Sequence, residues 1–144
     1  MNVNTQLQTP INPPILTNTA GAQTVFIFDD DPDILYICEV VLRNKGYTVH
    51  SSSNCNDIVD KVKEAGADII LLDNKIPPQG GIMAARELAR DIDTKKLPIV
   101  YFSANTQVEQ LSIEAGTKYF IQKPFDISEL EAIIASALYS QRAR

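Results

Sequence analysis

The 144-residue sequence contains no tryptophan, two cysteines and a single histidine. Two thiols, Cys38 and Cys55, are too few for a disulfide framework or a cysteine-based zinc site. The longest basic run is Lys95-Lys96, so the basic face typical of a nucleic-acid-binding module is not expected. No apolar stretch approaches the roughly 20 residues that cross a bilayer, and residues 1–23 lack the basic and apolar regions of a signal peptide. These absences predict a cytoplasmic protein that engages neither nucleic acid nor membrane.

The composition that remains is typical of one globular domain. Hydrophobic residues make up 44% of the chain and charged residues 22%, enough to bury a core. The 13 basic and 18 acidic residues give a net charge of −5. Residues 1–23 are rich in Asn, Thr, Gln and Pro and carry no charge, which predicts a flexible N-terminal tail. The expected folded domain is therefore residues 24–144.

Strand-like and helix-like segments alternate along this domain. Short apolar runs predict strands at 25–28, 47–50, 68–72, 98–102 and 119–121. Apolar residues with a helical period predict helices at about 32–45, 55–65, 82–92, 106–114 and 127–138. Strict alternation favours a parallel sheet covered by helices on both faces. The expected fold is α/β, a doubly wound (βα)5 flavodoxin-like sandwich with strand order 2-1-3-4-5.

Several conspicuous residues have an ordinary structural interpretation. Asp31 stands before Pro32 and is predicted to cap the first helix. The spacing of Asp126 and Glu129 is that of a capping box. The single histidine, His50, is expected to be a solvated residue at a strand end, and Cys38 falls on the buried stripe of the first helix.

The residues with chemical potential follow the predicted strands. Asp29 and Asp30 follow the first strand, Asp73 the third, Ser103 the fourth and Lys123 the fifth. Ligands of open α/β sheets bind beyond the carboxyl ends of the strands, where these side chains are expected to converge.

Three neighbouring carboxylates repel one another, and a hard divalent cation removes that conflict. Mg²⁺ takes oxygen ligands and commonly uses carboxylates together with a phosphate oxygen. A carboxylate can also act as a nucleophile toward phosphorus, and a transferring phosphoryl group needs cationic and hydrogen-bonding partners. Ser103 and Lys123 are suitable in kind. The pattern therefore predicts Mg²⁺-assisted phosphorylation of an aspartate.

Four segments resemble the signatures of the response-regulator receiver (CheY-like) domain of two-component signalling. They are FIFDDDPDI, ADIILLDNKIPPQGG, PIVYFSA and YFIQKPF, in the family's order, within residues 24–139. The resemblance implies that Asp73 is the phosphoacceptor. It also implies that Asp29, Asp30, Asp73 and the backbone carbonyl of Lys75 bind Mg²⁺.

The same resemblance assigns roles beside the acceptor. Ser103 would bond the phosphoryl group and Lys123 would pair with it. Phe120 falls at the aromatic switch position, which acts together with Ser103, and the bond between Lys123 and Pro124 is expected to be cis. The segment from Ser103 to Gly116 is shorter than in a well-known chemotaxis receiver, which predicts a short or shifted fourth helix. Lys75 stands where the family tunes phosphate loss, and a long cation there predicts a long-lived phosphoryl group.

The implied function is that of a single-domain response regulator. Only residues 140–144 follow the last predicted helix, too few for an output domain. The expected phosphodonor is a sensor histidine kinase or a phosphotransfer protein. The expected downstream protein partner binds the face formed by the fourth helix, fifth strand and fifth helix, with the receiver a monomer or a phosphorylation-dependent dimer. Such a domain is not an enzyme beyond catalysing its own phosphorylation and dephosphorylation.

Two other functions remain open from the sequence. One is a receiver-like scaffold that binds partners without phosphorylation. The other is a phosphohydrolase of the haloacid-dehalogenase type with Asp29 as nucleophile, because Asp29 and Asp31 have the Asp-x-Asp spacing of its first motif. The Thr or Val expected two positions after the second Asp is replaced by Asp33.

Overall fold

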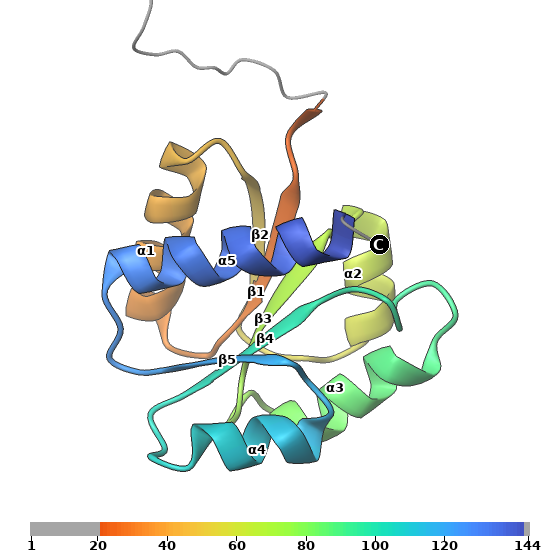
Figure 1. Ribbon diagram of the computed structural model, residues 1–144. Coiled ribbons are helices and arrows are strands. Elements are labelled where there is room, and N and C mark those ends of the chain that lie inside the picture. The colour runs from red at the N-terminus through yellow and green to blue at the C-terminus, as the bar shows by residue number, and fades with distance from the viewer. Residues whose placement is uncertain (1–20, 143–144) are drawn as a thin grey trace, which may run out of the picture.

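A five-stranded parallel sheet runs through the centre of the computed structural model, which describes residues 21–142 (Figure 1). The strands are β1 (Thr24–Phe28), β2 (Thr48–Ser52), β3 (Ile69–Asp73), β4 (Ile99–Ser103) and β5 (Tyr119–Gln122). The helices are α1 (Pro32–Asn44), α2 (Ile58–Ala65), α3 (Gly81–Arg90), α4 (Val108–Ala115) and α5 (Ile127–Arg142). The strand order is β2-β1-β3-β4-β5, which confirms the predicted flavodoxin-like, CheY-like fold.

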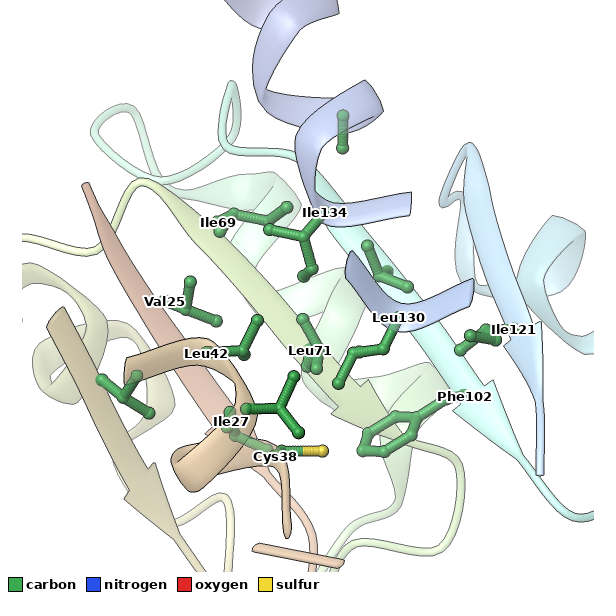
Figure 2. Packing of buried hydrophobic residues seen from close by; sticks show 14 of the residues in the cluster. Val25, Ile27, Cys38, Leu42, Ile69, Leu71, Phe102, Ile121, Leu130 and Ile134 are labelled. Atoms are coloured by element: carbon green, nitrogen blue, oxygen red, sulfur yellow. The ribbon is translucent and has the colours of Figure 1, made fainter. Parts of the chain in front are cut away.

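Side-chain alternation along the strands divides the core into two layers. Figure 2 shows one layer, in which Leu42 of α1 and Leu130 and Ile134 of α5 lie together over the sheet. The strand residues of this layer are Val25, Ile27, Val49, Ile69, Leu71, Val100, Phe102 and Ile121. The intervening strand residues face α2, α3 and α4; they include Phe26, Phe28, Ile70, Leu72 and Tyr101. Both faces of the sheet are therefore covered, as the continuous apolar runs of the strands require.

Strand register determines what meets at the carboxyl edge of the sheet. Phe28 of β1 pairs with Leu72 of β3, so the next residues on these neighbouring strands are Asp29 and Asp73. On the other side, Asp73 pairs with Phe102 of β4, and Ser103 of β4 pairs with Gln122 of β5. Ser103 and Lys123 thus reach the same edge.

The predicted caps are present. The Asp31 carboxylate accepts a hydrogen bond from the Asp33 N–H at 2.9 Å, and Pro32 begins α1. At α5, the Glu129 carboxylate accepts from the Asp126 N–H at 2.9 Å, which is one half of the predicted capping box. Each bond satisfies a backbone donor that has no partner within its helix.

Element boundaries differ from the predictions in several places; α5, for example, continues to Arg142 rather than ending near residue 138. Strand β2 continues to Ser52, so His50 lies inside the strand rather than at its end; it is exposed, as predicted, and stacks on Phe26. Helix α2 begins at Ile58 rather than near Cys55, because Asp57 adopts a left-handed conformation (φ 50°). Helix α3 ends at Arg90, which leaves Ile92 beyond the helix and 70% exposed.

The fourth helix is short, as predicted, with eight residues in α4. The predicted N-terminal tail lies outside the described residues except for 21–23, where the Gln23 carbonyl accepts from the Thr48 N–H at 2.9 Å. Of the helices formed by residues 21–142, none is long and apolar enough to cross a membrane.

Candidate functional site

Three carboxylates meet at the carboxyl ends of β1 and β3. Asp29 and Asp73 are 1% and 5% exposed, whereas Asp30 is exposed. Each residue offers an oxygen that lies within 4.8 Å of an oxygen of the others. The structure therefore brings together the three acidic residues that were expected to form a metal site.

A single ammonium group joins the two buried carboxylates. Lys123 Nζ donates to Asp29 Oδ2 at 2.6 Å and to Asp73 Oδ1 at 2.8 Å. It also lies 4.6 Å from the centroid of the Phe102 ring. The Lys123 N–H bonds to the Ser103 carbonyl at 2.9 Å, and the peptide bond between Lys123 and Pro124 is cis, as predicted.

The second oxygen of each buried carboxylate accepts a backbone hydrogen bond. Asp29 Oδ1 accepts from the Asp31 N–H at 2.9 Å, and Asp73 Oδ2 accepts from the Lys75 N–H at 3.0 Å. Both carboxylates are thus held by the same pattern, an ammonium on one oxygen and an N–H two residues later on the other. This pattern fixes their orientation before any ligand binds.

The electrostatics of the site reflect burial opposed by the ion pairs. Burial raises the pKa of Asp29, and the charge of Asp73 adds to the rise, whereas the bonds from Lys123 and from the Asp31 N–H oppose it. Burial alone would lower the pKa of Lys123, but its hydrogen bonds to Asp29 and Asp73 outweigh burial and raise it. Three carboxylates and one ammonium formally leave two negative charges at this edge.

The remaining predicted residues surround this cluster at different depths. Ser103 is 3% exposed, and its Oγ accepts from the Asn105 N–H at 3.0 Å. Lys75 is exposed in the turn after Asp73. Phe120 lies on the edge strand β5 with 36% of its surface exposed, so it is not a core residue.

Sequence reasoning missed a buried contact beneath the site. Tyr101 is fully buried in β4, and its hydroxyl donates to the Asn74 side-chain oxygen. The signal in the sequence was a tyrosine inside an otherwise apolar strand, because a buried hydroxyl requires a hydrogen-bonding partner. Burial, followed by the charge of Asp73, raises the pKa of Tyr101, so its hydroxyl stays protonated and able to donate.

The donor set fits a hard divalent cation. All side chains that converge are carboxylates, and Mg²⁺ prefers oxygen ligands. The formal negative charge that Lys123 leaves uncompensated is also what such an ion would neutralise.

Comparison with known proteins gives one family and several similar structures. The family model of the response regulator receiver domain matches residues 25–135. A protein provisionally named a response regulator, from Chloroflexus aurantiacus J-10-fl, is 25% identical with a TM-score of 0.77, covering 82% of this chain and 98% of its own. The receiver domain of a sensor histidine kinase from Pseudomonas aeruginosa PAO1 is 27% identical with a TM-score of 0.76 over 82% and 98% of the chains; that structure has magnesium coordinated in its active-site cleft. A CheY-like receiver from Methanospirillum hungatei JF-1, at 22% identity, shares the fold with a TM-score of 0.76 over 85% and 98%.

Proposed function

The chain belongs to the response regulator receiver domain family, and we propose that it accepts a phosphoryl group on Asp73 from a histidine kinase or a phosphotransfer protein. Its acidic triad of Asp29, Asp30 and Asp73 is typical of the phosphoacceptor site of this family. A receiver domain is usually not an enzyme in the ordinary sense, and the proposed chemistry is limited to its own phosphorylation and the loss of that phosphoryl group.

The proposal rests on the position of Asp73 between carboxylates on one side and a hydroxyl and an ammonium on the other. Asp73 ends the central strand β3, Asp29 directly follows the neighbouring strand β1, and Ser103 ends the other neighbouring strand, β4. A phosphoryl group on Asp73 would therefore have carboxylates for a cation on one side and a hydroxyl and Lys123 on the other. Asp29 is separated from β4 by β3, so a phosphoryl group there would be farther from Ser103.

In the proposed reaction, an Asp73 carboxylate oxygen attacks the phosphorus of a phosphohistidine. The new oxygen–phosphorus bond replaces the phosphorus–nitrogen bond, and the released imidazole nitrogen takes a proton from solvent. Lys123 transfers one of its hydrogen bonds from Asp73 Oδ1 to a phosphoryl oxygen, and the Ser103 hydroxyl donates a hydrogen bond to another.

The residues proposed to hold Mg²⁺ are Asp29, Asp30, Asp73 and the backbone carbonyl of Lys75. When bound, Mg²⁺ supplies positive charge for the phosphoryl oxygens and offsets repulsion among the carboxylates. Asp29 and Asp73 are already fixed by Lys123 and backbone donors, so little rearrangement is required of them.

The proposed output is a changed surface. Engagement of Ser103 by the phosphoryl group would draw in the segment between β4 and α4, and the half-exposed Phe120 ring would move inward beside it. The surface concerned comprises α4, β5 and α5, each with an exposed apolar side chain: Ile113, Phe120 and Ile127. These side chains support a downstream protein partner at this face.

The test is intact-mass spectrometry of the full chain after incubation with phosphoramidate or acetyl phosphate and Mg²⁺. The proposal predicts one added phosphoryl group in the wild type and none in Asp73→Asn. The exposed Asp60→Asn on α2 serves as a matched control and should be phosphorylated like the wild type. A wild type that gains nothing from several donors would favour the phosphorylation-independent scaffold. A gain that disappears only in Asp29→Asn would favour the phosphohydrolase alternative.

A further inference from the structure

The ring of Tyr101 lies in an apolar layer of the core, and its hydroxyl reaches the turn that follows Asp73. Tyr101 pairs with Leu72 in the β3–β4 ladder, and its ring packs in the layer that faces α3. The side chain is 0% exposed, so its hydroxyl has no access to bulk water. Burying a hydroxyl without a partner is costly, and here the partner is Asn74, the residue directly after the proposed phosphoacceptor.

Three hydrogen bonds hold Asn74 in place. Its N–H donates to the Phe102 carbonyl of β4 at 3.0 Å, and its carbonyl accepts from the Gly81 N–H of α3 at 2.8 Å. The Tyr101 hydroxyl holds the side chain. The next residue, Lys75, donates its N–H to Asp73 Oδ2 at 3.0 Å. Asn74, which Tyr101 holds, therefore lies in the same turn as the Lys75 N–H that orients the Asp73 carboxylate.

Gly81 packs closely against the Tyr101 hydroxyl. A Cβ atom at Gly81 would lie 2.6 Å from the Asp73 carbonyl oxygen and 2.8 Å from Tyr101 Oη. The amino-terminal end of α3, the hydroxyl and the turn after Asp73 are thus in close contact. Because interiors packed this closely transmit small displacements, loss of the hydroxyl is expected to affect the turn.

We propose that Tyr101 is a positioning residue for the phosphorylation site: through Asn74 it fixes the turn of residues 73–75, whose oxygens are proposed to hold Mg²⁺. This inference rests on the proposed function for the identity of the cation. Tyr101 itself touches neither the phosphoryl group nor the metal. Its effect is to keep the Asp73 carboxylate and the Lys75 backbone in one arrangement before the ion arrives.

The experiment compares Tyr101→Phe, which removes only the hydroxyl, with the wild type. Isothermal titration gives the Mg²⁺ dissociation constant, and phosphoramidate reactions at varied Mg²⁺ give the half-saturating concentration and the limiting rate. Loss of one hydrogen bond predicts Mg²⁺ binding weaker by about three- to tenfold. The half-saturating Mg²⁺ concentration should rise by the same factor, while the limiting rate at saturating Mg²⁺ should stay close to that of the wild type.

Ile69→Val is the matched control, because Ile69 is fully buried at the far end of β3, and its shortening lowers stability without touching the turn. It should leave Mg²⁺ binding unchanged. Asn74→Ala completes a double-mutant cycle: if Tyr101 acts through Asn74, adding Tyr101→Phe to Asn74→Ala should have no further effect on Mg²⁺ binding.

Unchanged Mg²⁺ binding in Tyr101→Phe overturns the inference, and so does an equal loss in Ile69→Val or full additivity with Asn74→Ala. The results for the wild type distinguish the positioning role of Tyr101 from the proposed phosphorylation of Asp73. A wild type that binds Mg²⁺ but gains no phosphoryl group rejects the proposed function, while the titrations still decide the role of Tyr101. A wild type that does not bind Mg²⁺ rejects the inference itself.

Discussion

Lys123 Nζ lies 2.8 Å from Asp73 Oδ1, and the same ammonium binds Asp29, directly after the neighbouring strand, at 2.6 Å. Lys123 is thus 50 and 94 positions away in the sequence from the two carboxylates with which it forms the centre of the site. The ammonium stands where positive charge is needed by the carboxylates before phosphorylation and by a phosphoryl group afterwards. This double use makes Lys123 the first residue to test.

Replacement of Lys123 by Met removes the charge and keeps much of the apolar stem. Two buried carboxylates then lose their shared partner, and the free energy of unfolding in EDTA should fall by about 1.5–3 kcal/mol. Added Mg²⁺ should raise the melting temperature of Lys123→Met more than that of the wild type, because the ion replaces the missing charge. The exposed Lys118→Met is the control. Equal Mg²⁺-dependent shifts in Lys123→Met and wild type would contradict this account.

Asp29 gives the site a pH dependence with a defined sign. Because burial raises the pKa of Asp29 in the folded chain, the folded state holds this proton more tightly than the unfolded state. The contribution of Asp29 to the free energy of unfolding therefore falls as pH rises from 3.8 through the raised pKa. In EDTA, Asp29→Asn should not show this decrease in the free energy of unfolding. Urea unfolding measures it between about pH 4, close to the ordinary carboxyl pKa, and about pH 7. An identical pH profile for the variant and the wild type would show that Asp29 does not titrate as described.

Lys75 is expected to control how long the phosphoryl group persists. Its exposed side chain follows Asp73 by two residues, where a long cation can shield the acyl phosphate from water. Lys75→Ala should lose phosphate several-fold faster than the wild type, measured by intact mass after removal of the donor. Lys95→Ala, exposed before β4 at the opposite edge of the sheet, should match the wild type. An unchanged or slower loss in Lys75→Ala rejects the prediction.

Gly81→Ala tests the close packing beneath the site. The new methyl group would lie 2.6 Å from the Asp73 carbonyl oxygen, so the start of α3 must shift. We expect a loss of about 1–3 kcal/mol in urea unfolding together with weaker Mg²⁺ binding. Gly66→Ala is the control, since its left-handed backbone (φ +63°) is strained by a side chain but its surroundings are open. It should lower stability and leave Mg²⁺ binding intact; weaker binding in both variants would assign the effect to stability alone.

Both thiols should be unreactive in the folded chain. Cys38 and Cys55 are 0% exposed, and burial raises the pKa of Cys38 to about 12, so thiolate is scarce at neutral pH. Iodoacetamide at pH 7.5, about one unit below the ordinary thiol pKa, should label neither residue in the native protein and both in urea. Rapid native labelling of Cys38, seen by intact mass, would contradict the burial described.

Much of the fold was predictable because it depends on local pattern. Alternating strand and helix signals fixed the element order, and the strand-end positions of Asp29, Asp73 and Ser103 followed from it. Parallel pairing then requires residues that follow neighbouring strands to meet, whatever the identity of the residues between them. Asp31 and Glu129 were recognisable because helix caps act over a few residues.

The deviations have tertiary causes. His50 lies inside β2 because pairing with β1 extends that strand to Ser52. Helix α2 begins after Cys55 rather than at it, because the Cys55 N–H bonds to the Pro77 carbonyl of a distant turn at 2.8 Å. The bond between Tyr101 and Asn74 joins residues 27 positions apart, which meet because β3 and β4 are paired, and no local pattern reveals it.

Chemical mapping of the modified residue decides whether Asp73 carries the phosphoryl group. The wild type is phosphorylated with phosphoramidate and Mg²⁺, reduced with borohydride so that the acyl phosphate becomes an alcohol, and digested for peptide mass analysis. Asp73 should be converted to homoserine, and the conversion should require both the donor and Mg²⁺. Conversion of Asp29 or Asp30 with Asp73 intact, or no conversion in a folded wild type, would contradict it.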